Sequence, residues 1–506
     1  MTEIRAGEAS PKSQEEHGAP PRGLGIGALA EDALIYGGAR VVLKSLAFLL
    51  VPLYAHFLAP ADFGVLELVL AIVAFIDVLI AANMDGVFAR FYFERHDAAW
   101  RRQIITLYLL IESLYPAVVI GGVILFSGTL SDRVFGTDQY VGFLVIALVD
   151  LYLTNIVDLP MILCRVRRKP MTFARYALAR GLVQVVFSVL LVAVWHLGVK
   201  GILIASLISV CAAFVFTARE WIHDLTRNIS PRVGREMIAF AWPGLIGGLS
   251  FFALNLMDRF FIKHYHGLTA NGLYGTAFRY SQIVFVGVMA FRMGWTQWHY
   301  SWLHTERHPS MVARGANYYF FATGFLAVLV SAWILPLFHL VMPPAYWPAT
   351  DAVAPLALAS VGAGAYTIFI VGLNVTKRMR LTAPLAMLGG AIAIGLYFLL
   401  IPPYSYRGAA WATAAAFASL ALLVLAVGQR IYPVPWQWRR ILLAVGLAVG
   451  LALTSLAIDH GLAMTVSIPA RLAVTLAYPA ALFALGFFPP GDIASARIRL
   501  RALLRR

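Results

Sequence analysis

The chain has 506 residues, of which 60% are hydrophobic and 13% are charged, and its formal net charge is +15. Soluble domains are typically about 45–50% apolar and 25% charged, so this composition excludes a soluble protein and indicates an integral membrane protein. The positive charge does not predict nucleic-acid binding, because the basic residues are gathered in short segments between hydrophobic runs.

Residues 1–31 are polar, with Pro, Gly and charges of both signs, and we expect a disordered cytoplasmic tail. The first hydrophobic run contains charges and is too long to suit a cleavable signal peptide. The two cysteines, Cys164 and Cys211, lie in hydrophobic runs and form no metal-binding motif. We therefore expect neither a metal nor a bound cofactor.

Residues 32–58 predict the first membrane-crossing helix, since about 20 apolar residues rising 1.5 Å each cross the bilayer core. Arg40 and Lys44 lie inside this run, four residues apart, and therefore share one face of the helix. A charge at that depth costs at least a few kcal/mol and usually faces a polar interior. The pair predicts a cationic, water-accessible cavity; structural pairing with acidic side chains is the alternative.

Hydrophobic runs separated by polar turns predict an all-α protein with fourteen membrane-spanning helices and no inserted soluble domain. The expected spans are 32–58, 65–90, 103–128, 138–163, 172–197, 199–221, 237–263, 271–298, 313–338, 347–374, 381–401, 408–430, 438–460 and 468–488.

Basic residues support this division independently. Clusters such as residues 165–169 (R-V-R-R-K) recur at every second turn, whereas the turns between them carry single basic residues such as Lys200 and Arg471. By the positive-inside rule, the clusters and both termini are cytoplasmic.

The chain also repeats itself. Residues 56–64 resemble residues 264–272, both having an early His and a final Gly at a separation of 208 positions. Residues 171–172 resemble 381–382, and residues 199–201 resemble 406–408, at nearly the same separation. These matches predict two six-helix lobes related by a pseudo-twofold axis along the membrane normal. The expected parts are an N-lobe at 32–236, a C-lobe at 237–430, two further helices at 431–488, and a basic cytoplasmic tail at 489–506.

Several basic residues remain inside the predicted spans. Arg90 and Arg175 lie near cytoplasmic ends, where a long side chain reaches water. Arg279 and Arg292 lie about 140° apart on a helical wheel, so both are not expected to line one cavity, and we favour Arg279. The orientation of Arg180 stays open.

Acidic residues inside the spans have two interpretations. Asp77, Asp150, Asp158 and Asp258 are counter-ions for the buried cations, or they form a proton or sodium relay. Asp258 and Arg259 are adjacent and form either a local ion pair or part of a polar face. A net cationic cavity favours an anionic ligand, because Arg presents a planar fork that suits phosphate oxygens and Lys adds a point charge.

Three segments carry a resemblance to a known family. They are the turn L-A-P-A-D-F-G at 58–64, the helix end with D-G at 85–86 and Arg90, and the second-half start from W-P at 242–243 through N-x-x-D-R at 255–259 to G-L-Y at 272–274. Over residues 32–430 the chain resembles the polysaccharide-transporter branch of the multidrug/oligosaccharidyl-lipid/polysaccharide (MOP) exporter superfamily. Asp85 before the glycine departs from the family pattern, which leaves its role open.

The resemblance implies a flippase in the bacterial cytoplasmic membrane that moves undecaprenyl-pyrophosphate-linked oligosaccharides, such as O-antigen (lipopolysaccharide) or exopolysaccharide units. In such flippases, cations on helices 1, 7 and 8 hold the pyrophosphate, which carries over here to Arg40, Lys44, Arg259 and Arg279. The implied partners are the lipid-linked oligosaccharide, membrane lipids and other glycan-assembly proteins. No nucleic acid is implied.

Two alternatives stay open. A drug/cation antiporter of the same fold would prefer an acidic cavity, which the surplus of buried Arg and Lys disfavours. A membrane glycan polymerase or ligase would need a substantial outer loop with catalytic side chains, and no such loop or nucleotide-binding motif is evident, so we do not expect an enzyme. The candidate energy sources are a Na⁺ or H⁺ gradient, the membrane potential, or consumption of the product outside.

Overall fold

The computed structural model describes residues 38, 48, 50–81, 84–461 and 464–489. Within these ranges every regular element is a helix and no residue forms a strand, which confirms the all-α prediction. Ten helical runs in this part of the chain are long and apolar enough to cross a membrane.

The helices of the first half follow the hydrophobic runs closely. They are α2 (Pro60–Ala81), α3 (Met84–Glu94), α4 (Ala98–Leu125), α5 (Ser127–Phe135), α6 (Val141–Val166), α7 (Pro170–Ser188) with a π-helical extension (Val189–Val194), and α8 (Gly198–Thr217). Short 3-10 turns follow at Ala218–Glu220 and Ile222–Asp224.

The helices of the second half are longer. They are α9 (Pro231–Asn255), α10 (Asp258–Ser301), α11 (His308–Val341), α12 (Thr350–Phe369), α13 (Val371–Val375), α14 (Thr382–Ile431), α15 (Trp438–Gly461) and α16 (Met464–Ala484). Short 3-10 turns precede α12 at Pro344–Ala349 and α14 at Met379–Leu381.

Each predicted span from 65–90 onward corresponds to one or more of these helices, although two of the expected turns are sharp bends rather than loops. Gly267 (φ 80°) bends α10 between the predicted spans 237–263 and 271–298, and Ser405 (φ 53°) bends α14 between 381–401 and 408–430. Of the first predicted span, residues 50–57 are helical, and most of the remainder lies outside the described residues.

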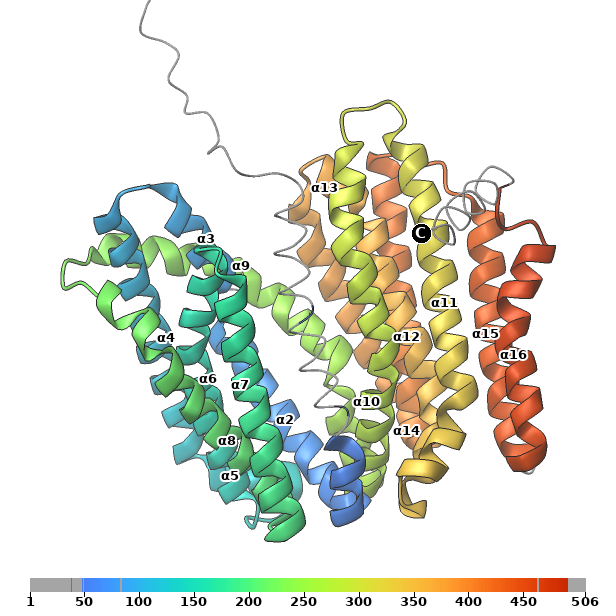
Figure 1. Cartoon of the computed structure of the whole chain (residues 1–506), viewed down its shortest axis with the longest axis horizontal. Coiled ribbons are helices and arrows are strands. Elements are labelled where there is room, and N and C mark those ends of the chain that lie inside the picture. Colours follow the sequence, from blue (N-terminus) through green and yellow to red (C-terminus); the bar gives the residue numbers. More distant parts are fainter. Residues whose placement is uncertain (1–37, 39–47, 49, 82–83, 462–463, 490–506) are drawn as a thin grey trace, which may run out of the picture.

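Figure 1 shows two groups of helices that converge at one end of the molecule and diverge at the other. Helices α2 to α8 form one group, and α10 to α16 form the other, with α15 and α16 at the outer edge. Helix α9 runs between the groups, packing mainly against α14 while also contacting α2 and α3. At the converging end the groups meet where α2 packs along α10.

The crossing of α2 and α10 depends on two glycines. A Cβ atom added to Gly64 would lie 1.9 Å from the carbonyl oxygen of Leu268, and one added to Gly272 would lie 1.8 Å from that of Pro60. Positions 60 and 268 are separated by 208 residues, and so are positions 64 and 272, so each pair is equivalent in the two repeats. The contact that one helix makes is therefore repeated with the two helices exchanged. Such reciprocal contacts are what a twofold axis between the two helices produces. The two backbones touch here because both residues, Gly64 and Gly272, lack a side chain.

One basic residue lies elsewhere than expected. Arg471, which the sequence placed among the outer turns, is only 1% exposed. Its guanidinium pairs with Asp459 of α15 (Nη2–Oδ1, 2.6 Å) and donates to the Ala332 carbonyl of α11 at 2.7 Å. Burial of a charged group requires such partners, so Arg471 fastens α15 and α16 to the second group of helices.

Candidate functional site

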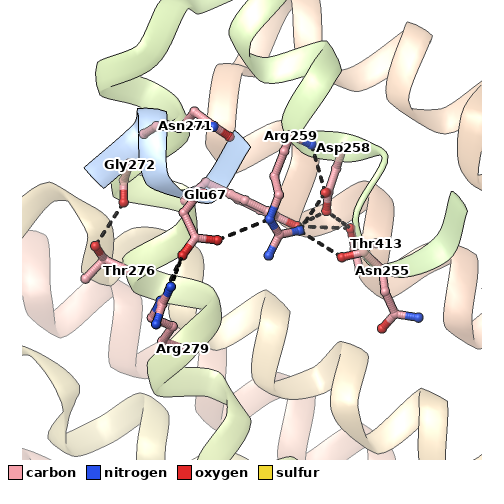
Figure 2. A network of polar contacts seen from close by, with 11 residues as sticks. Glu67, Asn255, Asp258, Arg259, Asn271, Gly272, Thr276, Arg279 and Thr413 are labelled. Atoms are coloured by element: carbon pink, nitrogen blue, oxygen red, sulfur yellow. Dashed lines mark hydrogen bonds and ion pairs between the residues drawn. The ribbon is translucent and has the colours of Figure 1, made fainter. Parts of the chain in front are cut away.

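The main polar cluster of the membrane interior lies where α2 meets α10, and Figure 2 shows it. Its centre is Glu67 of α2, which faces Asp258 and Arg259 at the start of α10. All three are buried, with exposed fractions of 4%, 0% and 1%. Helix α9 ends at Asn255, and this interruption leaves the Asn255 carbonyl free to accept a hydrogen bond from Arg259 Nη1 at 2.8 Å.

Glu67 binds two arginines across the boundary between the helix groups. Its Oε2 accepts from Arg259 Nε at 3.3 Å, and its Oε1 pairs with Arg279 through Nε at 2.8 Å and Nη2 at 2.6 Å. Arg259 Nη1 also pairs with Asp258 Oδ1 at 2.9 Å. Two carboxylates therefore face two guanidiniums, and the cluster as a whole is neutral.

The rest of the cluster satisfies the remaining polar atoms. Asp258 Oδ2 accepts from the Tyr274 hydroxyl and, at 3.4 Å, from Thr413 Oγ1 of α14. The Arg259 guanidinium lies 4.6 Å from the centre of the Phe278 ring, and Arg279 lies 5.1 Å from that of Phe63. Buried ion pairs persist when their hydrogen bonds are met in this way, and loss of one partner then costs about 3–5 kcal/mol.

Glu67 fits against α10 because residue 275 is a glycine. A Cβ atom at Gly275 would lie 2.2 Å from Glu67 Cγ. Positions 67 and 275 are separated by the same 208 residues as the two crossing glycines. The two repeats have thus diverged at equivalent positions, with an acid on α2 and the space for it on α10.

A small cavity adjoins this cluster on the side of the first helix group. Its volume is about 140 Å³, and its lining includes Arg279, Tyr54, Asp150, Gln184 and Ser206. The Arg279 side chain is 27% exposed, so this guanidinium both binds Glu67 and borders open space. An anion entering the cavity would meet the face of Arg279 that Glu67 does not cover.

The residues singled out from the sequence are distributed unevenly around this site. Arg279 and Asp150 line the same cavity, whereas Arg259 and Asp258 are enclosed in the neutral cluster. Arg40 and Lys44 lie outside the described residues. Of the two alternatives left open for Asp258 and Arg259, the local ion pair is present in the structure, and Glu67 is added to it.

Asp77 and Asp158 lie elsewhere, on α2 and α6, within electrostatic reach of each other and of Asp85. Arg180 donates to Thr154 Oγ1 at 3.3 Å. Arg292 is exposed, in agreement with its position on the other face of its helix from Arg279.

Glu67 is the functional candidate that the sequence analysis missed. It lies three residues after Gly64, inside a hydrophobic run, and an intramembrane acid at that place was a signal in itself. Its partners are about 200 positions away, so no local pattern connects them. No group of three or more His, Cys, Asp or Glu side chains suited to a metal ion occurs in the part of the chain that the structure describes.

Comparison with known proteins is consistent with this architecture. Residues 29–294 match the model of a family described as polysaccharide biosynthesis protein. No curated protein sequence matches the chain.

Solved structures share the fold at low sequence identity. The lipid II flippase MurJ in an inward closed conformation superposes with a TM-score of 0.71 at 12% identity, covering 89% of this chain and 99% of the other. An inward-facing multidrug resistance MATE family transporter of the MOP superfamily gives 0.64 at 12% identity, covering 77% and 93%. An outward-facing MATE transporter gives 0.55 at 13% identity, covering 80% and 94%. The family match extends over more than half of the chain, so this multi-pass membrane protein belongs to the polysaccharide biosynthesis protein family and has the fold of the MOP transporters.

Proposed function

We propose that the protein is a flippase that moves a polyprenyl-pyrophosphate-linked oligosaccharide, with undecaprenyl as the lipid, across the bacterial cytoplasmic membrane for cell-surface polysaccharide synthesis. The observation that carries the proposal is the position of Arg279. Its guanidinium borders a cavity and is held by Glu67, a carboxylate from the opposite helix group. A pyrophosphate offers the same kind of oxygen acceptors with more negative charge, so it can compete with Glu67 for this arginine.

The arrangement of the helices supports alternating access with an inward-open state. The connection between α3 and α4, near the basic residues Arg95 and Arg101, lies at the diverging end in Figure 1. The positive-inside rule assigns that end to the cytoplasm and the crossing of α2 with α10 to the outer side.

Competition for Arg279 would link substrate binding to opening on the outer side. Glu67 ties α2 to α10 by pairing with Arg279 and Arg259. When a pyrophosphate takes Arg279, Glu67 loses its stronger pair and the crossing is weakened. The lobes then separate at the outer end, and the bound headgroup faces outward. In this mechanism the substrate supplies the differential binding energy that a conformational change requires.

A genetic and lipid assay tests the proposal. Deletion of the gene should cause a pyrophosphate-linked oligosaccharide to accumulate on the inner leaflet, shielded from an outside-facing probe, and the wild-type gene should reverse this. Arg279→Gln should fail to restore export, whereas Arg292→Gln should restore it, because Arg292 is an exposed arginine on the same helix. Unchanged lipid-linked glycans after deletion would refute the flippase assignment.

Drug/cation antiport is the second candidate, and the acidic groups of the first helix group favour it. Asp77, Asp85 and Asp158 lie near one another there, as a cation-binding site requires. Increased sensitivity to cationic drugs after gene deletion, without any change in lipid-linked glycans, would establish this function instead.

A further inference from the structure

A second polar cluster lies inside the first helix group, apart from the α2–α10 crossing. It contains four carboxyl groups, each from a different helix: Asp77 of α2, Asp85 of α3, Glu112 of α4 and Asp158 of α6. Asp85 is anchored, because it pairs with Arg165 (Oδ2–Nη2, 2.9 Å) and accepts from the Tyr108 hydroxyl at 3.3 Å.

Glu112 is more deeply buried than the other three. It is 3% exposed, and its Oε1 is buried without a hydrogen-bond partner among the described residues. It lies about halfway along the 28-residue helix α4, roughly 21 Å from the helix start at 1.5 Å per residue. An orphaned oxygen on an almost fully buried acid near the bilayer centre is rare, and each such group calls for an explanation.

Among the described residues, the charged groups around Glu112 do not neutralise it. Asp77, Asp85 and Asp158 all repel it, and Tyr108 precedes it by one helical turn. The nearby cations are engaged elsewhere, because Arg165 pairs with Asp85 and Arg180 of α7 donates to Thr154. No lysine or arginine contacts Glu112 in the part of the chain that the structure describes. An unpaired carboxylate in this environment is strongly disfavoured relative to the neutral acid.

A proton relieves this situation with one carboxyl group alone, because protonation removes the charge that burial disfavours. Among the described residues no three acidic, His or Cys side chains are arranged to hold a metal. Asp85 offers a route to water, since 52% of its side chain is exposed and it bonds to Tyr108, next to Glu112 on α4. We propose that Glu112 is a proton-binding site that is protonated in this state and loses its proton to water when the helices rearrange during transport.

This inference rests on the proposed transport function only for the coupling step. The transfer itself is simple: the Glu112 carboxylic O–H breaks, the proton passes to water, and the carboxylate forms. Binding of a proton in one state and its release in another would couple transport to a proton gradient.

Infrared difference spectroscopy of the full-length protein tests the protonation directly. At neutral pH we expect the wild-type spectrum to contain the carbonyl stretch of a protonated carboxyl group. This band should be absent from Glu112→Gln and present in the control Glu236→Gln. Glu236 is an exposed acid that pairs only with Arg232 among the described residues. A wild-type spectrum without this band, or one that Glu112→Gln leaves unchanged, would overturn the inference.

Transport in proteoliposomes tests the coupling, with undecaprenyl pyrophosphate as the probe. A gradient of one pH unit should change the wild-type rate by up to about tenfold for a one-proton step, and the rate of Glu112→Gln should be independent of the gradient. A gradient dependence that persists in Glu112→Gln would refute the coupling role. If the wild type does not move the probe at all, the proposed function fails, while the infrared result still decides the proton site.

Discussion

Replacing Glu67 with Gln should shift the protein toward a state that is open at the α2–α10 crossing. The carboxylate pairs with Arg259 and Arg279, and the substitution removes its charge with little change in shape. Loss of one partner from a buried ion pair costs about 3–5 kcal/mol. Because the Arg279 side chain is 27% exposed, water partly solvates its guanidinium when Glu67 is replaced. We therefore expect the lower value, about 3 kcal/mol. That energy corresponds to a population shift of about a hundredfold.

Double electron–electron resonance can measure this shift as a change in the distance between spin labels at positions 57 and 265, which Phe57 and Tyr265 occupy. Both side chains are exposed, at 41% and 40%, and they lie on opposite sides of the crossing at equivalent positions of the two repeats. The two cysteines, Cys164 and Cys211, must first be replaced.

We expect Glu67→Gln to populate a longer distance between the two labels, while the exposed acid Glu236, changed to Gln, leaves the distribution unchanged. If Glu67→Gln retains the wild-type distribution and the wild-type melting temperature, the carboxylate does not hold the crossing closed and the reasoning is wrong.

Three further variants test other parts of the chain. Gly272→Val should prevent the close approach of α10 to α2, because even a Cβ atom would lie 1.8 Å from a backbone oxygen, and thermal melting should show a loss of several degrees or more. Arg471→Ala should cost about 3–5 kcal/mol, because Asp459 loses the guanidinium with which it pairs inside the protein, and limited proteolysis between α15 and α16 should report it. Arg40→Gln with Lys44→Gln should abolish transport while leaving abundance in the membrane unchanged.

Hydropathy and charge predicted the helices because both signals are local. A run of apolar residues long enough to cross a bilayer has few alternatives, since unpaired backbone groups cannot be exposed to lipid. The bends at Gly267 and Ser405 lie where turns were expected, and a left-handed conformation costs little at a glycine. The wheel argument that separated Arg279 from Arg292 also corresponds to the structure, since one borders a cavity and the other is exposed.

The partners of the buried charges could not be predicted, because they depend on how distant helices cross. Arg259 was assigned to a substrate-binding face, yet it is 1% exposed, since the interruption after Asn255 directs it into the interior. Arg471 lies near the start of a predicted span. The hydropathy of the sequence there is the same whether the Arg471 side chain is exposed or buried. Only the packing of α15 and α16 against α11 shows that this side chain is buried.

The glycine at position 275 explains why the crossing can carry charge at all. If the repeats had remained identical, an acid at 67 would face an acid at 275 near the axis, and two buried like charges would repel. Gly275→Ala should therefore act like Glu67→Gln although it changes no charge, because its Cβ would lie 2.2 Å from Glu67 Cγ and expel the carboxylate from its two arginines. Gly395→Ala is the matched control, since no atom lies within 4 Å of the added Cβ. A wild-type distance distribution in Gly275→Ala would show that Glu67 holds α10 without needing this space.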